Sequence, residues 1–284
     1  MSNEKNIVVG FLAKALEHNS EDVRCDAVRA LRGIGDHRVD DRVNALLCKA
    51  LSDSSYGVRS TAVAALGEVG DERTIEILTA KLKDTSKDVR YAVVDALGHI
   101  GLRKILEKKT PDKVVEPLIM AVGDRNRDVR EFAVMSSSAI GDKRTVEPLI
   151  ERLINDRVAF VRSSAGFALF MMAYYGRVDG RMIVEPLIET IKDMNPSERV
   201  HTELMETIEI FAISIYVTDS EFECLFEYLC EALDMLKAMD ARKHKAVIAY
   251  LGRLLEKSWM ARDERISVKV RIAKLRDYLN SAKA

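Results

Sequence analysis

Apolar residues recur three and four positions apart along the first 200 residues, a spacing that places them on one face of an α-helix. Two of these apolar stripes are Ile75, Leu78 and Leu82, and Val146, Leu149 and Leu153. A second helical segment rich in small residues follows the first stripe, at 84–101. The pattern predicts pairs of short helices joined by turns. One such pair cannot bury its own apolar face, so neighbouring pairs must stack to form a core.

The second helix of each predicted pair carries a recurring skeleton. An aspartate is followed by a Val-Arg dipeptide five and six residues later, and then by Ala-Leu-Gly-x-Ile-Gly or a variant, as in 84–101. The Asp and Arg of four copies are Asp53 and Arg59, Asp84 and Arg90, Asp124 and Arg130, and Asp156 and Arg162. A first copy has His18 in place of the aspartate. Successive arginines, from Arg24 to Arg199, are 35, 31, 40, 32 and 37 residues apart, which indicates a repeat array.

The first helices share the block Val-Glu-Pro-Leu-Ile, which occurs at 115–119, 146–150 and 184–188. We expect its proline in the first helical turn, where the missing N–H would have no intrahelical partner. Thr74 and Thr145 are the predicted N-caps of their helices. A glycine follows the second helix of four copies, where a left-handed C-cap residue is expected. These glycines are Gly35, Gly70, Gly101 and Gly141.

The motifs D-x-x-x-x-V-R, A-L-G-x-I-G-D and V-E-P-L-I resemble the HEAT-like repeats of the short type named after the phycobilisome lyases. The resemblance covers residues 20–200. It implies an all-α, right-handed α-solenoid in which each aspartate caps its second helix and each arginine ties neighbouring repeats together. On this interpretation the four Asp and Arg pairs form a structural ladder inside the stack. A row of phosphate-binding arginines is the alternative.

The same resemblance implies that enzymatic functions must also be considered. Bilin lyases with this repeat attach a tetrapyrrole to a cysteine of a partner, so a subunit of a lyase-type enzyme is one alternative function. HEAT-like deoxyhypusine hydroxylases present His-Glu pairs to a di-iron site, but none of the five histidines here is followed by Glu. We predict no metal or cofactor site and no catalytic residue. His99 lies four residues after Asp95 on one helical face, and a surface hydrogen bond is a simpler explanation than acid–base chemistry.

The repeat skeleton ends at Arg199, and we divide the chain there. Residues 1–202 are the expected repeat array, and 203–284 are expected to form a degenerate repeat and C-terminal capping helices. Lys237 to Ala284 contains 13 Lys and Arg against five Asp and Glu. Nucleic-acid binding through this basic segment is therefore a further alternative. The basic residues we would test for it are Arg262, Arg265, Lys269 and Arg271.

With 48% hydrophobic and 31% charged residues, the 284-residue composition is that of a globular protein. No apolar run is long enough for a membrane span, so we expect no membrane partner. The start of the chain lacks the pattern of a signal peptide, and the four cysteines lack C-x-x-C spacing. We expect free thiols and a cytoplasmic location. An insertion at 102–112 is expected either to extend a helix or to form an edge loop.

Second helices line the concave face of such arrays, so the residues that vary between copies are the candidates for partner binding. Their character changes from polar in the early copies, where Cys25 and Ser60 stand, to apolar and aromatic in the later ones. The partner-binding candidates are Tyr91, Asp95, Phe132, Met135, Phe160 and Phe167. Phe160 and Phe167 have an alternative role as core residues under the C-terminal helices. The sequence favours a non-catalytic scaffold, adaptor or assembly factor that binds another protein.

Overall fold

A computed structural model describes residues 3–34, 41–69 and 72–180 of the chain, together with scattered positions between 182 and 281. The chain forms two compact units, Met1–Ile140 and Gly141–Ala284. The predicted all-α solenoid is confirmed, and the described residues contain helices but no strand. None of the described helices has the length and apolarity needed to cross a membrane. The division at residue 202 and the expected capping helices lie outside the described residues.

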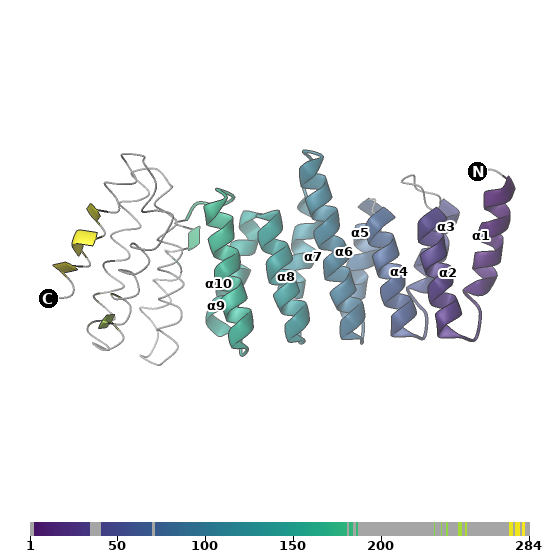
Figure 1. Ribbon diagram of the computed structural model, residues 1–284, viewed down its shortest axis with the longest axis horizontal. Helices are drawn as coiled ribbons and strands as arrows, with labels where there is room; N and C mark the ends of the chain where they lie inside the picture. Colours follow the sequence, from purple (N-terminus) through teal and green to yellow (C-terminus); the bar gives the residue numbers. More distant parts are fainter. Residues whose placement is uncertain are drawn as a thin grey trace. The chain divides into compact units, whose positions relative to one another are not determined.

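Helix–turn–helix pairs build the first unit (Figure 1). Its helices are α1 (Asn3–Ala15), α2 (Glu21–Ile34), α3 (Asp41–Ala50), α4 (Tyr56–Val69), α5 (Glu72–Ala80), α6 (Lys87–Leu106), α7 (Asp112–Val122) and α8 (Arg127–Ile140), with the 3-10 helix η1 (Lys81–Lys83) after α5. The second unit contains the 3-10 helix η2 (Lys143–Thr145), α9 (Val146–Asn155) and α10 (Ala159–Tyr174). Thus each copy of the skeleton that lies within the described residues forms the second helix of a pair.

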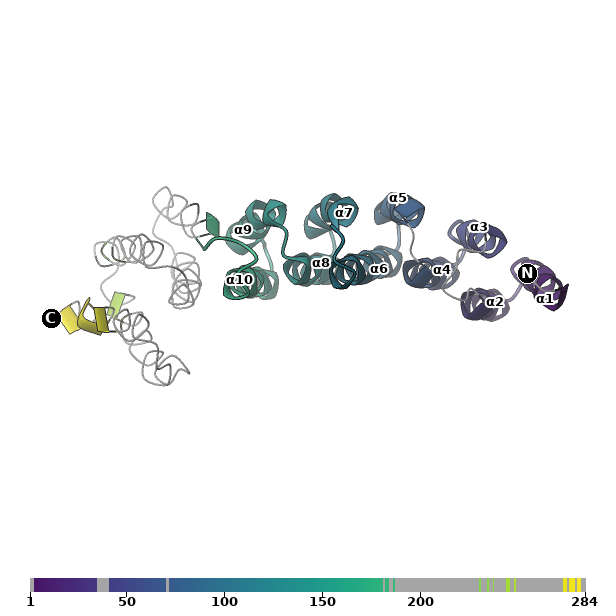
Figure 2. The ribbon, with the colours of Figure 1, turned by 90° about the horizontal axis from the view of Figure 1, so that it is seen from above.

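Within the first unit the helices form two rows (Figure 2). The helices α2, α4, α6 and α8, here called the second-helix row, pack one against the next, and α3, α5 and α7 lie behind them. Apolar side chains from both rows fill the space between. The largest fully buried ones include Leu47, Leu66, Ile75, Leu78, Leu97 and Leu118. One apolar stripe per helix therefore makes a continuous core, as the repeat pattern predicts.

Small residues let neighbouring second helices approach closely. A Cβ atom at Gly67 of α4 would lie 2.5 Å from Cβ of Ala96 in α6. A Cβ atom at Gly101 would lie 2.6 Å from Cδ1 of Ile140 in α8. The glycines of the Ala-Leu-Gly-x-Ile-Gly stretch therefore set the distance between successive pairs. This explains why the skeleton keeps small residues at these positions.

The expected C-cap at Gly101 is wrong, because α6 continues to Leu106 and extends past its neighbours (Figure 1). The insertion at 102–112 thus lengthens the helix. Lys108 takes the left-handed conformation instead, with a φ of 57°. The amide of Lys109 then donates to the carbonyl of Lys104 at 2.8 Å, which is the Schellman pattern of a helix end. Gly141 does adopt the expected left-handed conformation, with a φ of 70°.

Two expectations about first helices also need correction. Because α5 begins at Glu72, Thr74 lies inside the helix and is buried rather than forming its N-cap. Pro117 lies inside α7, beyond the first turn, since that helix begins at Asp112. Thr145 does stand at the N-cap of α9, but its hydroxyl donates to the carbonyl of Asp142 instead of capping the helix. The helices α5 and α7 therefore start earlier than the sequence motifs indicate.

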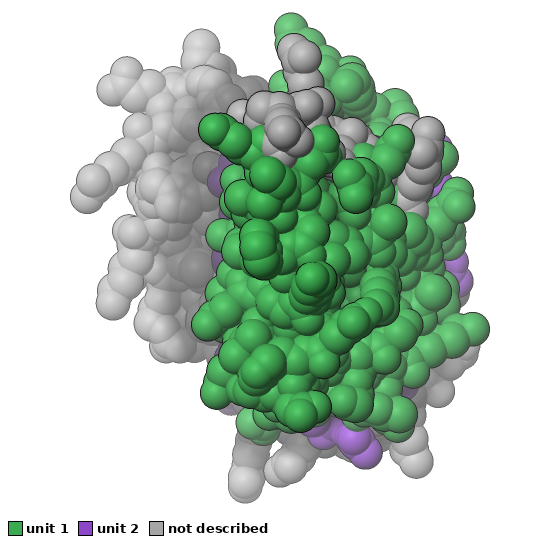
Figure 3. Space-filling view, turned by 90° about the vertical axis from the view of Figure 1, so that its right-hand side faces the viewer, with its two compact units in different colours: residues 1–140 green, residues 141–284 purple. Residues whose placement is uncertain are grey.

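The first helix, α1, leaves apolar side chains at the surface. Ile7, Val8 and Phe11 are 54%, 46% and 68% exposed. Figure 3 views the molecule from the end at which α1 lies, with residues 1–140 in green. These three side chains therefore lie outside the buried core.

The contact between α4 and α6 gives a direct test of how small residues control packing. Replacing Gly67 with alanine should lower the free energy of unfolding by about 1 to 3 kcal/mol, because the added methyl group overlaps Ala96. Gly33→Ala in α2 is the matched control, since nothing lies within 4 Å of the position that its methyl group would take. Chemical denaturation should show Gly33→Ala to be neutral or slightly stabilising. Equal effects of the two replacements would contradict this packing.

Candidate functional site

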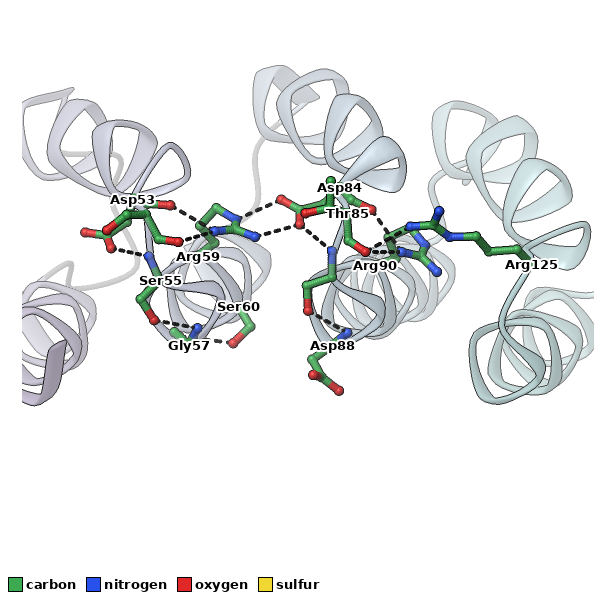
Figure 4. A network of polar contacts seen from close by, with 12 residues as sticks. Asp53, Ser55, Gly57, Arg59, Ser60, Asp84, Thr85, Asp88, Arg90 and Arg125 are labelled. Carbon is green, nitrogen blue, oxygen red and sulfur yellow. Dashed lines mark hydrogen bonds and ion pairs between the residues drawn. The ribbon is translucent and has the colours of Figure 1, made fainter.

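The arginines of the Val-Arg dipeptides are engaged inside the array and are not available for binding. Arg59 of α4 donates from Nε and Nη2 to both carboxylate oxygens of Asp84, each at 2.8 Å (Figure 4). Its Nη1 donates to the carbonyl oxygen of Asp53 at 2.9 Å. The same arrangement joins Arg24 to Asp53 and Arg90 to Asp124, with Nε-to-carboxylate distances of 2.7 Å in both. We call the pairs Arg24–Asp53, Arg59–Asp84 and Arg90–Asp124 the Arg–Asp ladder.

Each aspartate of the ladder also shapes the turn before its own second helix. The carboxylates of Asp53, Asp84 and Asp124 accept the amide N–H two residues later, at 2.8, 2.9 and 2.7 Å. The N-cap of α6 is Ser86, whose hydroxyl accepts from the amide of Asp88. The aspartate is therefore not the capping residue that the resemblance implies. It fixes the turn and receives the arginine of the preceding repeat.

In the first copy, His18 makes local hydrogen bonds like those that the aspartate makes in later copies. Its Nδ1 accepts the amide N–H of Ser20 at 3.0 Å, as the aspartates do in later copies. Its carbonyl oxygen accepts from Nη1 of Arg24 at 2.9 Å, again as in later copies. The imidazole nitrogen and the backbone carbonyl of His18 thus make the same local hydrogen bonds that the aspartates make in later copies. The local half of the arrangement persists later in the chain, where Arg130 and Arg162 donate to the carbonyls of Asp124 and Asp156.

Burial and hydrogen bonding act in opposite directions on these carboxylates. Hydrogen bonding from Arg24 lowers the pKa of Asp53 against the opposing effect of burial. Burial acts to raise the pKa of Asp84, but Arg59 and the amide of Ser86 outweigh it, so the net shift is also downward. Ladder arginines thus have their donors directed at carboxylates and carbonyls. This arrangement argues against the alternative of a phosphate-binding row.

The partner-binding candidates in the first unit do lie on the exposed side of the second-helix row. Tyr91 of α6 stacks on Phe132 of α8, with ring centroids 4.6 Å apart and planes inclined by 23°. Tyr91 is 40% exposed and the nearby helical position Met135 is 39% exposed. The structure therefore brings the exposed Tyr91 and the half-buried Phe132 into one aromatic pair that spans two repeats. Aromatic pairs of this kind are typical of protein interfaces.

Carboxylates surround this pair, and most of them are absent from the sequence candidates. Burial together with the negative charges of Asp95, Glu131 and Asp128 raises the pKa of the Tyr91 hydroxyl. A hollow of about 250 Å³ lies between the beginnings of α6 and α8. Its lining includes Asp88, Tyr91 and Asp128. The missed residues Asp88 and Asp128 occupy the same repeat position, two residues before the arginine, which is the signal that could have revealed them.

A second, wider groove crosses the same row over α4. It has a volume of about 590 Å³ and a floor of small residues that includes Ser60, Thr61 and Ala64. Arg29 and Arg32 of α2 lie on one side of it. These two guanidiniums are paired with Asp26 at 2.7 Å and Glu68 at 3.0 Å. Cys25, placed on this surface by the sequence pattern, is buried instead.

Phe160 and Phe167 lie on α10, which belongs to the second unit. They are 64% and 51% exposed, whereas Met172 on the same helix is buried. The ring of Phe167 stacks on Phe170, with centroids 5.8 Å apart. The six sequence candidates are therefore divided between the two units, four on α6 and α8 and two on α10.

Candidate chemistry is sparse on the described surface. Nε2 of His99 lies 3.9 Å from Oδ1 of Asp95, and both side chains are solvent-exposed. Within the described ranges, no group of three or more His, Cys, Asp and Glu could hold a metal ion. The basic residues Arg262, Arg265, Lys269 and Arg271, which support the nucleic-acid alternative, lie outside the described residues. The surface features that the described helices do present, rings and carboxylates, are suited to contact with another molecule.

A family model described as HEAT repeats matches residues 44–111 and 78–170, the stretch that carries most of the Arg–Asp ladder. Residues 44–170 therefore consist of HEAT-like repeats. No curated protein matches the chain.

Solved structures with a similar arrangement share little sequence with this HEAT-like repeat protein. The CpcE–CpcF complex of phycocyanin lyase from Nostoc sp. PCC7120 is 21% identical, and the match covers 57% of this chain and 98% of that one, with a TM-score of 0.45. The YibA protein of Escherichia coli is 19% identical, with coverages of 89% and 98% and a TM-score of 0.45. Human deoxyhypusine hydroxylase in complex with glycerol is 19% identical, with coverages of 99% and 98% and a TM-score of 0.41. At these values the likenesses carry no argument about activity.

The lowered pKa of Asp84 predicts how the ladder responds to acid. Its stabilising effect is present above the ordinary value of 3.8 and is lost as the pH falls through the lower folded value. Asp84→Asn should reduce the free energy of unfolding by about 1 to 3 kcal/mol at neutral pH, because Arg59 loses its charged acceptor. The difference between wild type and variant should shrink below pH 3.8.

Urea denaturation over a range of pH checks this expectation. The exposed Glu76 of α5 provides a matched control, and Glu76→Gln should follow the wild-type curve. A difference between wild type and Asp84→Asn that stays constant as the pH falls well below 3.8 would show that the Arg59–Asp84 pair does not carry the acid dependence.

Proposed function

We propose that this HEAT-like repeat protein is a non-catalytic scaffold or adaptor that binds another protein through the exposed side of α6 and α8. The observation that carries the proposal is the stacked pair of Tyr91 and Phe132, with the exposed Met135 on the same helix as Phe132. We call Tyr91, Asp95, Phe132 and Met135 the α6–α8 face. Large aromatic side chains at a surface are the residues on which protein interfaces most often depend.

The position of these rings supports binding rather than packing. The core between the helix rows is filled by aliphatic side chains that are fully buried, so the rings are not needed to close it. Tyr91 has the same repeat position as Ser60 in α4, one residue after the ladder arginine. A position that the scaffold fills equally well with a small polar residue is free to vary with the partner. The two aromatic side chains are therefore additions to the repeat.

The Arg–Asp ladder supports the proposal in a second way. It joins the turn before α6 to the turns of the neighbouring repeats, through Arg59–Asp84 on one side and Arg90–Asp124 on the other. Arg90 is only 3% exposed, so this link is well protected from water. Helices held in this way present their side chains in a fixed arrangement before a partner arrives. Less conformational entropy is then lost on binding.

Site-specific photo-cross-linking tests the proposal with a matched control on the opposite row. Benzoylphenylalanine placed at Met135 should give a discrete adduct with a partner protein in lysate of the source cells, because this side chain lies on the α6–α8 face. The same group at Met120 of α7, which is 53% exposed on the other row, should not give that adduct. Adding Phe132→Asp to the Met135 probe should abolish the adduct while the protein still unfolds cooperatively.

Two results would contradict this function. One is the same adduct from both probe positions, which would show that neither row is selective. The other is loss of cooperative unfolding in Phe132→Asp, because that would make the ring a core residue.

A further inference from the structure

The α6–α8 face is strongly acidic around its aromatic pair. Asp88 and Asp95 on α6, and Asp128 and Glu131 on α8, place four carboxylates on the two helices that carry the rings. Asp128 is already paired, with Nζ of Lys87 at 3.4 Å and Nε of Arg127 at 3.2 Å. Among the described residues, Asp88 and Glu131 form no ion pair. Two negative charges beside the rings are therefore left without a compensating cation.

The hollow between α6 and α8 places one of these carboxylates next to an aromatic ring. Asp88 and Tyr91 line it from α6, one helical turn apart, and Asp128 lines it from α8. Asn126 and Val129 complete the α8 side. Its volume is about 250 Å³, and it opens to solvent. Lys87 of α6 also lines it, with its ammonium group paired to Asp128. A group that enters this hollow therefore meets the Tyr91 side chain and the carboxylate of Asp88, which has no ion-pair partner among the described residues.

We propose that the partner of this protein presents an arginine-bearing segment, whose guanidinium groups stack on the Tyr91–Phe132 pair and hydrogen-bond to the carboxylates of Asp88 and Glu131. This proposal rests on the protein-binding function and specifies the chemistry of the partner. A guanidinium is planar, stacks on aromatic rings and donates in pairs to carboxylates, so one group satisfies both features of the face.

Other partner chemistries fit the face less well. An acidic segment would be repelled by the carboxylates around Tyr91. A wholly apolar segment would cover the rings but remove Asp88 and Glu131 from water without a partner, which costs free energy. A lysine segment would satisfy the charges, but an ammonium group lacks the planar shape that stacks and forms paired hydrogen bonds. The combination of rings and unpaired carboxylates therefore selects arginine.

The test uses the full chain and two fluorescein-labelled peptides of equal charge. One alternates glycine with four arginines, and the other alternates glycine with four lysines. Fluorescence anisotropy should show tighter binding of the arginine peptide, with an affinity that falls as salt is added. Tyr91→Ser should weaken arginine-peptide binding by roughly two- to fivefold and reduce the preference over lysine, because the stacking contact is lost.

Charge variants separate a local site from general attraction to an acidic protein. Asp88→Asn combined with Glu131→Gln should weaken arginine-peptide binding by roughly fivefold or more. Glu4→Gln combined with Glu76→Gln also removes two negative charges, but from exposed positions on α1 and α5. This control should leave the affinity unchanged. Equal weakening by the two double variants, or equal binding of the lysine peptide, would overturn the proposal.

The outcome also separates this proposal from the protein-binding function. If the probe at Met135 forms its adduct but the arginine peptide shows no preference, the face binds a protein and the assignment of arginine is wrong. If the peptide binds as expected and Asp88→Asn with Glu131→Gln also prevents the adduct, the two proposals support each other.

Discussion

The bidentate hydrogen bond between an arginine of one repeat and the aspartate of the next is the interaction on which the first unit depends. Arg24, Arg59 and Arg90 each reach both oxygens of the following aspartate, at distances between 2.7 and 2.9 Å. The same guanidinium binds carbonyl oxygens of its own turn, and the same carboxylate accepts an amide of its turn. One pair of side chains thus fixes two turns and the step between them.

Burying an ion pair is favourable only when its remaining donors and acceptors are satisfied. The Arg90–Asp124 pair meets this condition, since Nη1 of Arg90 donates to the carbonyl oxygens of Asp84 and Thr85 at 2.9 and 3.2 Å. Oδ1 of Asp124 accepts the amide of Asn126 in addition to Arg90. We therefore regard the Arg–Asp ladder as a device that specifies how repeats align. Apolar burial between the helix rows remains the main source of stability.

Much of the fold could be predicted from the sequence because the repeat skeleton reports directly on helix pairing. The exceptions have local causes. Gly101 matches the glycine that ends other second helices, but the insertion lets α6 continue and moves the left-handed residue to Lys108. The expected positions of Thr74 and Pro117 are wrong because their helices begin before the recurring blocks. A motif marks its repeat position well and the helix boundary only approximately.

Less of the candidate site could be predicted, because its geometry depends on how two neighbouring repeats contact each other. Tyr91 and Phe132 stand at different positions relative to their arginines, one and two residues after Arg90 and Arg130. Their stacking depends on the stagger of α6 against α8, which no single repeat encodes. Asp88 and Glu131 become candidates for binding only because that contact places the two rings together. Sequence comparison between repeats finds the variable positions, but geometry is needed to show which of them meet.

The residues of the Arg–Asp ladder and those of the α6–α8 face have different roles. The ladder aligns the helices, and the proposed binding by the face depends on that alignment. The Arg–Asp ladder accounts for the fixed alignment of the helices that carry Tyr91 and Phe132. If the ladder does not couple neighbouring repeats, the aromatic pair has no fixed geometry for a partner to bind.

A double-mutant cycle on Arg90 and Asp124 measures that coupling most directly. Arg90→Ala, Asp124→Ala and the double variant would be compared by urea denaturation at neutral pH. We expect a coupling free energy of about 1 to 3 kcal/mol between the two side chains. Strictly additive effects, with a coupling energy near zero, would contradict the role of the ladder in aligning the repeats.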